Sequence, residues 1–115
     1  MADLAAKGYL DDAAFAQTYA RERSARREGP ARIEQRLRAR GISREEAKAA
    51  IEPMQDPAKL LAVAIDLLTR WNRRSKPADP AKRLQAAAAY LVRQGYSFDT
   101  ARKATRRVMG NEPED

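Results

Sequence analysis

Cysteine and histidine are both absent from this sequence of 115 residues. The chain can therefore form no disulfide, has neither a thiol nor an imidazole for catalysis, and lacks the usual ligands of zinc sites. No apolar run approaches the roughly 20 residues that a membrane-spanning helix needs. Asp3 and Lys7 interrupt any signal-peptide hydrophobic region at the N-terminus, so we expect a cytoplasmic protein without membrane contact.

Glycine, proline and aromatic residues are few, with 5 Gly, 6 Pro and 6% aromatic residues. The sequence is rich in Ala and Arg, which favour helices, and no window alternates between apolar and polar residues with the period of a strand. Hydrophobic residues make up 43% of the chain, but many of them are Ala. We therefore expect an all-α protein with a thin core and no strands.

Three similar segments predict one type of helix-to-helix joint: Gly8-Tyr9-Leu10-Asp11-Asp12, Gly41-Ile42-Ser43 and Gly95-Tyr96-Ser97. In each segment a glycine in the left-handed conformation ends a helix, an apolar residue folds back onto it, and an Asp or Ser caps the next helix. The joints divide the chain into divergent repeats. We expect tandem three-helix repeats resembling helix-turn-helix units, packed at right angles in an elongated helical array.

Six apolar stripes with helical spacing lie between these joints. They predict helices over about residues 11–27, 30–40, 43–54, 56–72, 80–94 and 97–108. Residues 1–10 are then the end of a helix from a preceding repeat, 11–55 and 56–110 are three-helix repeats, and 111–115 are an acidic tail. Ser43 and Glu46 form a capping box at the start of the third helix.

The balance of charge is basic, with 23 Lys and Arg against 16 Asp and Glu, a net charge of +7 and a pI near 10.1. Residues 21–48 hold ten basic and five acidic side chains, and residues 70–83 hold six basic side chains against the single Asp79. Such a surface attracts polyanions or acidic proteins.

The basic residues gather on a few helix faces. Arg32, Arg36 and Arg40 recur every fourth residue and form a ridge, for which Glu28 beside Arg32 is the one obvious intrahelical acid. The basic cluster of residues 70–76 has no acid at all at that spacing, and it continues into a predicted loop over residues 73–78. We predict contacts with a partner or polyanion for Arg23, Arg26, Arg27, Arg32, Arg36, Arg40, Arg70, Arg73, Arg74, Lys76, Arg102 and Arg106.

The aromatic residues fall mostly on the apolar stripes, which favours packing over base stacking. Phe15, Tyr19, Trp71 and Phe98 are expected to face inward, whereas Tyr90 lies off its stripe and is the aromatic residue that we assign to a partner contact.

No candidate active site is found in the sequence. The carboxylate pairs Asp11-Asp12 and Glu45-Glu46 lie at helix starts, where capping explains them. With no histidine and no third convergent carboxylate, we expect no enzyme activity, no metal and no cofactor.

The chain resembles the RecX family of bacterial recombination regulators. An ordered set of segments carries the resemblance over about residues 4–108: Gly8-Tyr9-Leu10-Asp11-Asp12, Phe15-Ala16, Arg23-Ser24, Gly29-Pro30, Arg32-Ile33, Leu37-Arg38, Gly41-Ile42-Ser43 and Arg93-Gln94-Gly95-Tyr96-Ser97-Phe98-Asp99. The resemblance implies a helical repeat protein that binds RecA, lies in the groove of the RecA–DNA filament, and suppresses recombinase, ATPase and coprotease activity. It also implies a further three-helix repeat before Gly8, of which this chain carries only the end of the last helix.

Three functions stay open at this point. The first is the regulation of a recombinase filament, the second is weak nucleic-acid binding without sequence preference, and the third is an adaptor role in which the charge is incidental. The basic residues are spread over several helices, whereas a sequence-specific reader concentrates its contacts on one recognition helix. The spread favours contact with phosphates or a protein surface over the reading of bases.

Overall fold

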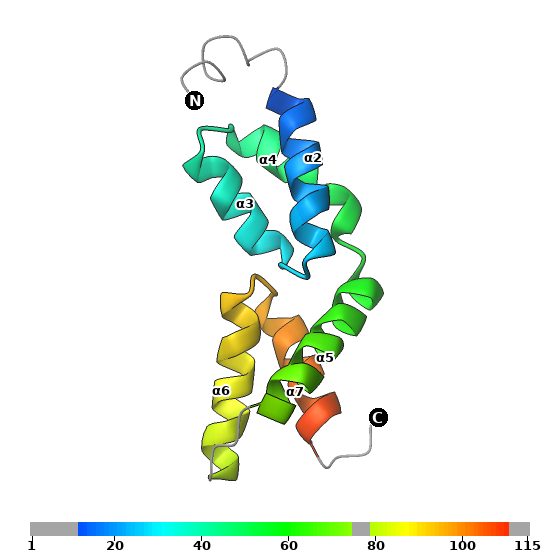
Figure 1. The fold of residues 1–115 in the computed structure, drawn as a ribbon, viewed down its shortest axis with the longest axis vertical. Coiled ribbons are helices and arrows are strands. Elements are labelled where there is room, and N and C mark those ends of the chain that lie inside the picture. Colours follow the sequence, from blue (N-terminus) through cyan, green and yellow to red (C-terminus); the bar gives the residue numbers. More distant parts are fainter. Residues whose placement is uncertain (1–11, 75–78, 111–115) are drawn as a thin grey trace. The chain divides into compact units, whose positions relative to one another are not determined.

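The structure is a computed structural model that describes residues 12–74 and 79–110. The helices of these residues are, in chain order, α2 (Asp12–Ala25), α3 (Pro30–Ala39), α4 (Arg44–Ile51), the 3₁₀ turn η2 (Glu52–Met54), α5 (Pro57–Arg74), α6 (Pro80–Arg93) and α7 (Phe98–Met109) (Figure 1). No strand occurs in the described ranges, which confirms the all-α prediction. The predicted joint at Gly8, the helix before it and the acidic tail lie outside the described residues.

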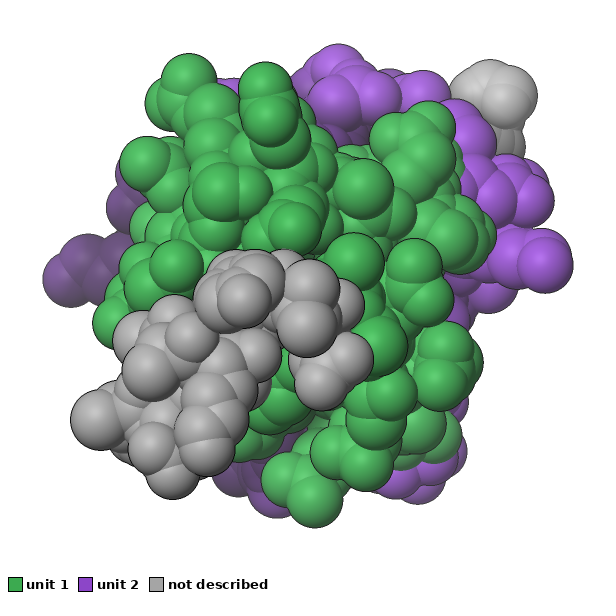
Figure 2. All heavy atoms as spheres, turned by 90° about the horizontal axis from the view of Figure 1, so that it is seen from above, with its two compact units in different colours: residues 1–55 green, residues 56–115 purple. Residues whose placement is uncertain are grey.

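The chain divides into two compact units, residues 1–55 and 56–115, which Figure 2 colours separately. In the first unit α2 and α3 both pack on α4, and in the second unit α5 and α6 both pack on α7. The third helix of each unit is therefore the one that joins the other two. None of the described helices is both long and apolar enough to cross a membrane.

The core of the first unit centres on Ile33 and Leu37, which lie one turn apart on α3 and are fully buried. Small side chains on α2 and α4 allow the three helices to pack closely around them. Phe15 and Tyr19 stack with ring centres 5.8 Å apart, as their spacing on α2 predicts. The buried members of this core are Ala16, Tyr19, Ala20, Ile33, Leu37, Ile42, Ala47, Ala50 and Ile51.

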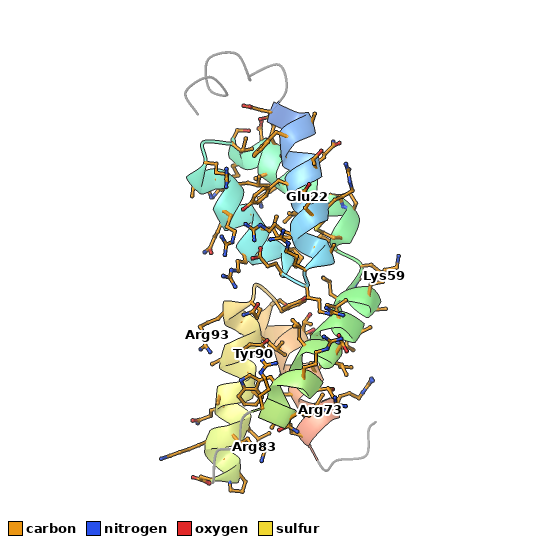
Figure 3. All side chains as sticks on the ribbon, viewed as in Figure 1. Glu22, Lys59, Arg73, Arg83, Tyr90 and Arg93 are labelled. Carbon is orange, nitrogen blue, oxygen red and sulfur yellow. The ribbon has the colours of Figure 1, made fainter. Side chains whose placement is uncertain are left out.

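The second unit has a core of its own. Its buried members are Ala64, Leu68, Ala87, Leu91, Tyr96, Ala101 and Ala104. Trp71 of α5 stacks on Tyr90 of α6, with ring centres 5.8 Å apart and an angle of 22° between the ring planes. Figure 3 labels Tyr90 on α6. Tyr90 is half-buried and packs against Trp71 although it lies off its apolar stripe, and its contact with a partner stays a prediction.

Phe98 lies at the surface of the second unit, against prediction. It is 77% exposed, although it continues the inward-facing stripe of its helix, and Leu84 and Val92 of α6 are exposed as well, each at 42%. At the start of α7 the core is filled instead by Tyr96, which is 4% exposed. Helical spacing alone therefore placed Phe98 wrongly, because the joint that precedes it already supplies an aromatic ring to the core.

The two described joints have the predicted geometry. Gly41 and Gly95 have φ angles of 96° and 106°, in the left-handed region that a glycine adopts without strain. The backbone N–H of the next residue, Ile42 or Tyr96, donates to a carbonyl of the preceding helix at 3.1 Å in both joints. These two apolar residues are buried, so each joint packs the end of the preceding helix against the core of its unit.

The predicted helix caps are also present. The hydroxyl of Ser43 accepts a hydrogen bond from the N–H of Glu46, and the hydroxyl of Ser97 accepts one from the N–H of Thr100, both at 3.1 Å. At the start of α6 a carboxylate oxygen of Asp79 accepts from a backbone N–H at 3.2 Å. Each cap satisfies a donor that the helix itself leaves free.

Candidate partner-binding surface

Glu28 lies in the turn between α2 and α3, and its side chain is 10% exposed. The preceding residue, Arg27, has a φ of 69°, which bends the chain sharply out of α2. Gly29 and Pro30 then begin α3, where the fixed φ of proline suits the first helical position. The turn therefore holds the carboxylate of Glu28 close to the end of α2 and to the first turns of α3.

Three guanidinium groups surround this carboxylate. One oxygen of Glu28 lies 3.5 Å from Arg23, 3.8 Å from Arg32 and 3.4 Å from Arg36. We call these four residues the Glu28 cluster. Its three positive charges and one negative charge leave two net positive charges on a partly exposed face, while the second oxygen of Glu28 has no hydrogen-bond partner among the described residues.

The interpretation of the ridge as largely unpaired is therefore wrong. That interpretation considered only acids three or four residues away in the sequence, and at this spacing Glu28 pairs with Arg32 alone. The turn brings Arg23 and Arg36 to the same carboxylate, although neither is three or four residues from Glu28 in the sequence.

Arg40 adds a further positive charge next to this cluster. Its guanidinium lies 5.0 Å from the centre of the Tyr19 ring, and that of Arg23 lies 5.2 Å from the same centre. Cation–π attraction of this kind orients a guanidinium without neutralising it. Arg40 and the exposed Arg26 make no ion pair with a carboxylate of the described residues, whereas Arg27 is half-buried in the turn.

The basic cluster of the second unit also differs from its prediction. α5 extends to Arg74, so Arg73 and Arg74 lie on its last turn and not in a loop. Both are exposed and make no ion pair within the described residues. Figure 3 labels Arg73 near the end of α5. Arg70 pairs with Asp66 one turn earlier, at 3.4 Å, so the expectation of no acid near this cluster is wrong. Lys76 lies outside the described residues.

On α7 the two predicted contact residues differ in their surroundings. Arg102 lies 2.7 Å from one carboxylate oxygen of Asp99, and Lys103 lies 3.4 Å from the other. Lys103 first, and Arg102 after it, lower the pKa of Asp99 below its ordinary value. Arg106, one turn further along, is exposed and makes no ion pair with the residues that the structure describes.

The described residues hold no group of His, Cys, Asp or Glu side chains that could bind a metal ion. What the surface offers is positive charge held in place by a carboxylate, an aromatic ring and helix ends. Charge-assisted hydrogen bonds from such guanidiniums suit phosphates and carboxylates.

The fold and surface together define an all-helical protein built from three-helix units with basic faces. Residues 11–51 match the family model described as the second three-helix domain of RecX. The chain is 36% identical to a regulatory protein RecX from Halorhodospira halophila over 103 residues, which are 88% of this chain and 61% of that protein. It therefore belongs to the RecX family.

Other relatives carry the same name. The chain is 33% identical over 110 residues to the regulatory protein RecX of Streptomyces coelicolor, covering 94% of this chain and 57% of that one. For Deinococcus radiodurans the identity is 34% over 109 residues, with 94% of this chain and 50% of the relative covered. The chain thus spans between half and about three-fifths of the length of these relatives. No solved structure matches it.

Proposed function

We propose that this chain binds the nucleoprotein filament of RecA and reduces its recombinase, ATPase and coprotease activities. Membership of a family whose relatives are named regulatory proteins supports a regulatory role. The family resemblance supports RecA as the partner. The predicted contact residues supply the surface, with the Glu28 cluster and Arg40 in the first unit and Arg70, Arg73, Arg74, Arg102 and Arg106 in the second.

The observation that carries the proposal is the Glu28 cluster. Three guanidiniums gathered around one carboxylate keep two net positive charges in a fixed geometry. Their side chains are 25–36% exposed, so they can reach a partner while they remain attached to Glu28. Fixed charges lose less conformational entropy on binding than free arginine side chains do, and they steer an acidic or DNA-lined groove towards the protein.

The test is the effect of the purified chain on ATP hydrolysis and strand exchange by RecA on single-stranded DNA. Reversing the ridge to Glu is unsuitable, because the new carboxylates would crowd Glu28. A neutral set avoids this repulsion by changing four side chains to Gln together: Glu28, Arg32, Arg36 and Arg40. A matched control makes the same change in net charge at exposed positions of the first unit, namely Glu22, Arg21, Arg44 and Lys48.

We expect the neutral set to need at least about tenfold more protein for the same inhibition, as the loss of central charged contacts usually weakens binding by that much. The control should inhibit like the unchanged chain. Equal inhibition by the neutral set would show that the surface is wrong, and no inhibition by the unchanged chain would show that the function is wrong.

The alternative is a nucleic-acid-binding module without sequence preference. The exposed Arg73, Arg74 and Arg106, which have no carboxylate partner among the described residues, favour it. Binding to DNA in the absence of RecA, with no change in RecA activity, would support this alternative against the filament proposal.

A further inference from the structure

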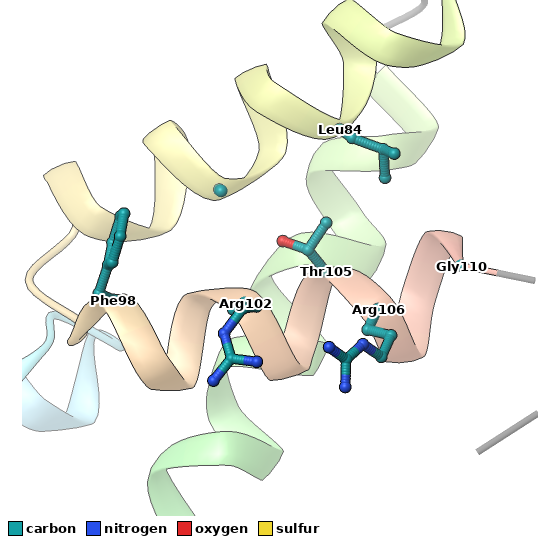
Figure 4. Close-up of a pocket in the computed structure, with 7 residues that line it drawn as sticks. Leu84, Phe98, Arg102, Thr105, Arg106 and Gly110 are labelled. Carbon is teal, nitrogen blue, oxygen red and sulfur yellow. The ribbon is translucent and has the colours of Figure 1, made fainter. Parts of the chain in front are cut away.

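A groove of about 420 Å³ runs between α6 and α7 in the second unit (Figure 4). Its apolar walls come from Leu84 and Ala88 of α6 and from Phe98 of α7. A second hollow shares Leu84 with it and continues past Arg83 and Met109. The two together form a surface long enough for several side chains of a partner.

The groove exposes large apolar side chains that the core does not use. Phe98 is 77% exposed and Leu84 is 42% exposed, and both line the groove. Single exposed apolar residues are common, but two that face one hollow mark a surface that gains free energy when it is covered.

The floor of the groove holds a polar group without a partner. Thr105 is 7% exposed, lines the groove between Leu84 and Phe98, and its hydroxyl makes no hydrogen bond within the described residues (Figure 4). A buried hydroxyl normally has a partner, because burial removes it from water. A ligand that reaches the floor with a donor or acceptor would supply one.

The charge around the groove is positive. Arg102 and Arg106 line it from α7, one turn apart, and Arg106 makes no ion pair in the described part of the chain. Arg102 shares the single carboxylate of Asp99 with Lys103. The described part of the second unit carries 11 basic and 4 acidic side chains. This excess favours an acidic occupant and opposes the docking of a second copy of the same unit.

We propose that this groove binds an acidic amphipathic helix of a partner protein. A large apolar side chain of the helix packs between Leu84 and Phe98, carboxylates beside it meet Arg102 and Arg106, and a polar side chain bonds to the hydroxyl of Thr105. An apolar stripe flanked by charge is the usual form of a helix that docks in a groove. The inference goes beyond the proposed function: Arg102 and Arg106 also belong to the proposed RecA surface, but the apolar groove and its occupant do not, and the test is made without RecA.

The probe is a synthetic labelled peptide of about 16 residues, long enough to form a helix when it docks. It carries Leu and Phe at helical spacing on one face and Glu on both flanks. One control peptide has the same composition in scrambled order, and another has Lys in place of every Glu. Fluorescence anisotropy with the full chain should show saturable binding of the first peptide, weakened by salt, and at least about tenfold weaker binding of both controls.

Variants of the chain locate the site. Phe98→Ser should weaken binding of the acidic peptide at least about tenfold, as the loss of a central aromatic contact does. Val92→Ser is the control, because Val92 is an exposed apolar residue of the same unit, 42% exposed on α6, that does not line the groove. Thr105→Val keeps the shape of the floor and removes the hydroxyl, and should weaken binding about threefold without lowering thermal stability.

Three results would overturn the proposal. The first is that the scrambled peptide binds as well as the striped one. The second is that the Phe98→Ser variant binds the striped peptide like the unchanged chain. The third is that sedimentation shows a dimer of the unchanged chain and a monomer of the Phe98→Ser variant, which would mean that a second copy occupies the groove. Circular dichroism of each variant verifies that the helices are retained, so that a loss of binding is not a loss of fold.

Discussion

The guanidinium of Arg36 lies 3.4 Å from the carboxylate of Glu28, eight residues earlier and in the turn before α3. Arg23 reaches the same oxygen from the end of α2. A residue of the turn thus ties the two helices together and, at the same time, fixes the positions of the arginines that we assign to partner binding. The packing of the first unit and the placing of these arginines therefore depend on one acidic side chain.

Glu28→Gln should destabilise the first unit by about 2 kcal/mol, because three guanidiniums would lose their shared counter-charge and repel one another in a partly buried place. Urea unfolding followed by circular dichroism measures this change. Glu22→Gln, at an exposed position of α2, is the control and should unfold at the midpoint of the unchanged chain. Equal midpoints for both variants would show that the Glu28 cluster contributes nothing to stability.

Binding to DNA alone should be weak, independent of sequence and steeply reduced by salt. Each phosphate contact releases a counterion, so a plot of log affinity against log salt on duplex DNA should lose about 0.9 in slope for each contact removed. Arg73→Gln with Arg74→Gln should lower the slope by nearly twice that amount. Lys59→Gln, at the exposed start of α5, should leave it unchanged. A strong preference for one sequence would contradict this prediction.

Gly41→Ala should cost about 1 kcal/mol, because φ is 96° at this joint and a side chain there is strained. No atom lies within 4 Å of the position of the new Cβ, so the loss arises from the backbone and not from a clash. Gly41→Asn should lose less, since asparagine tolerates the left-handed region better than alanine. Thermal unfolding of the two variants would contradict this account if their order were reversed.

The pKa of Asp99 should lie below its ordinary value in the folded chain, because Lys103 and then Arg102 favour the ionised form. A lowered pKa in the folded state stabilises the fold above the ordinary pKa, and this contribution is lost as the pH falls through the lowered value. An NMR titration of the carboxyl carbon measures the pKa. Lys103→Gln should raise it, and Lys82→Gln on α6 should not. An equal pKa of Asp99 in the unchanged chain and in the Lys103→Gln variant would rule out Lys103 as the cause.

The helical architecture could be predicted from the sequence because its signals are local. Gly41 and Gly95 mark helix ends through backbone conformation, and Ser43 and Ser97 mark helix starts through hydrogen bonds to residues three positions away. The two partners of such an interaction lie within one helical turn, so both can be identified from their spacing in the sequence.

The arrangement of the surface could not be predicted in the same way. The ion pairs of Arg23 and Arg36 with Glu28 depend on how sharply the chain turns at Arg27, which no spacing rule gives. The exposure of Phe98 depends on which neighbouring ring fills the core. The hydroxyl of Thr105 is buried without a hydrogen-bond partner among the described residues, which depends on how α6 packs beside α7 and not on any spacing within α7.

The stacking of Trp71 on Tyr90 provides a fluorescence probe for the second unit alone. Trp71 is the one tryptophan of the chain, and both rings of the pair belong to the second unit. Its emission responds to the separation of α5 from α6, whereas melting of α2 from α3 leaves its stacking partner in place. Emission and far-ultraviolet dichroism recorded on one sample would then show whether the two units lose their structure together or in sequence.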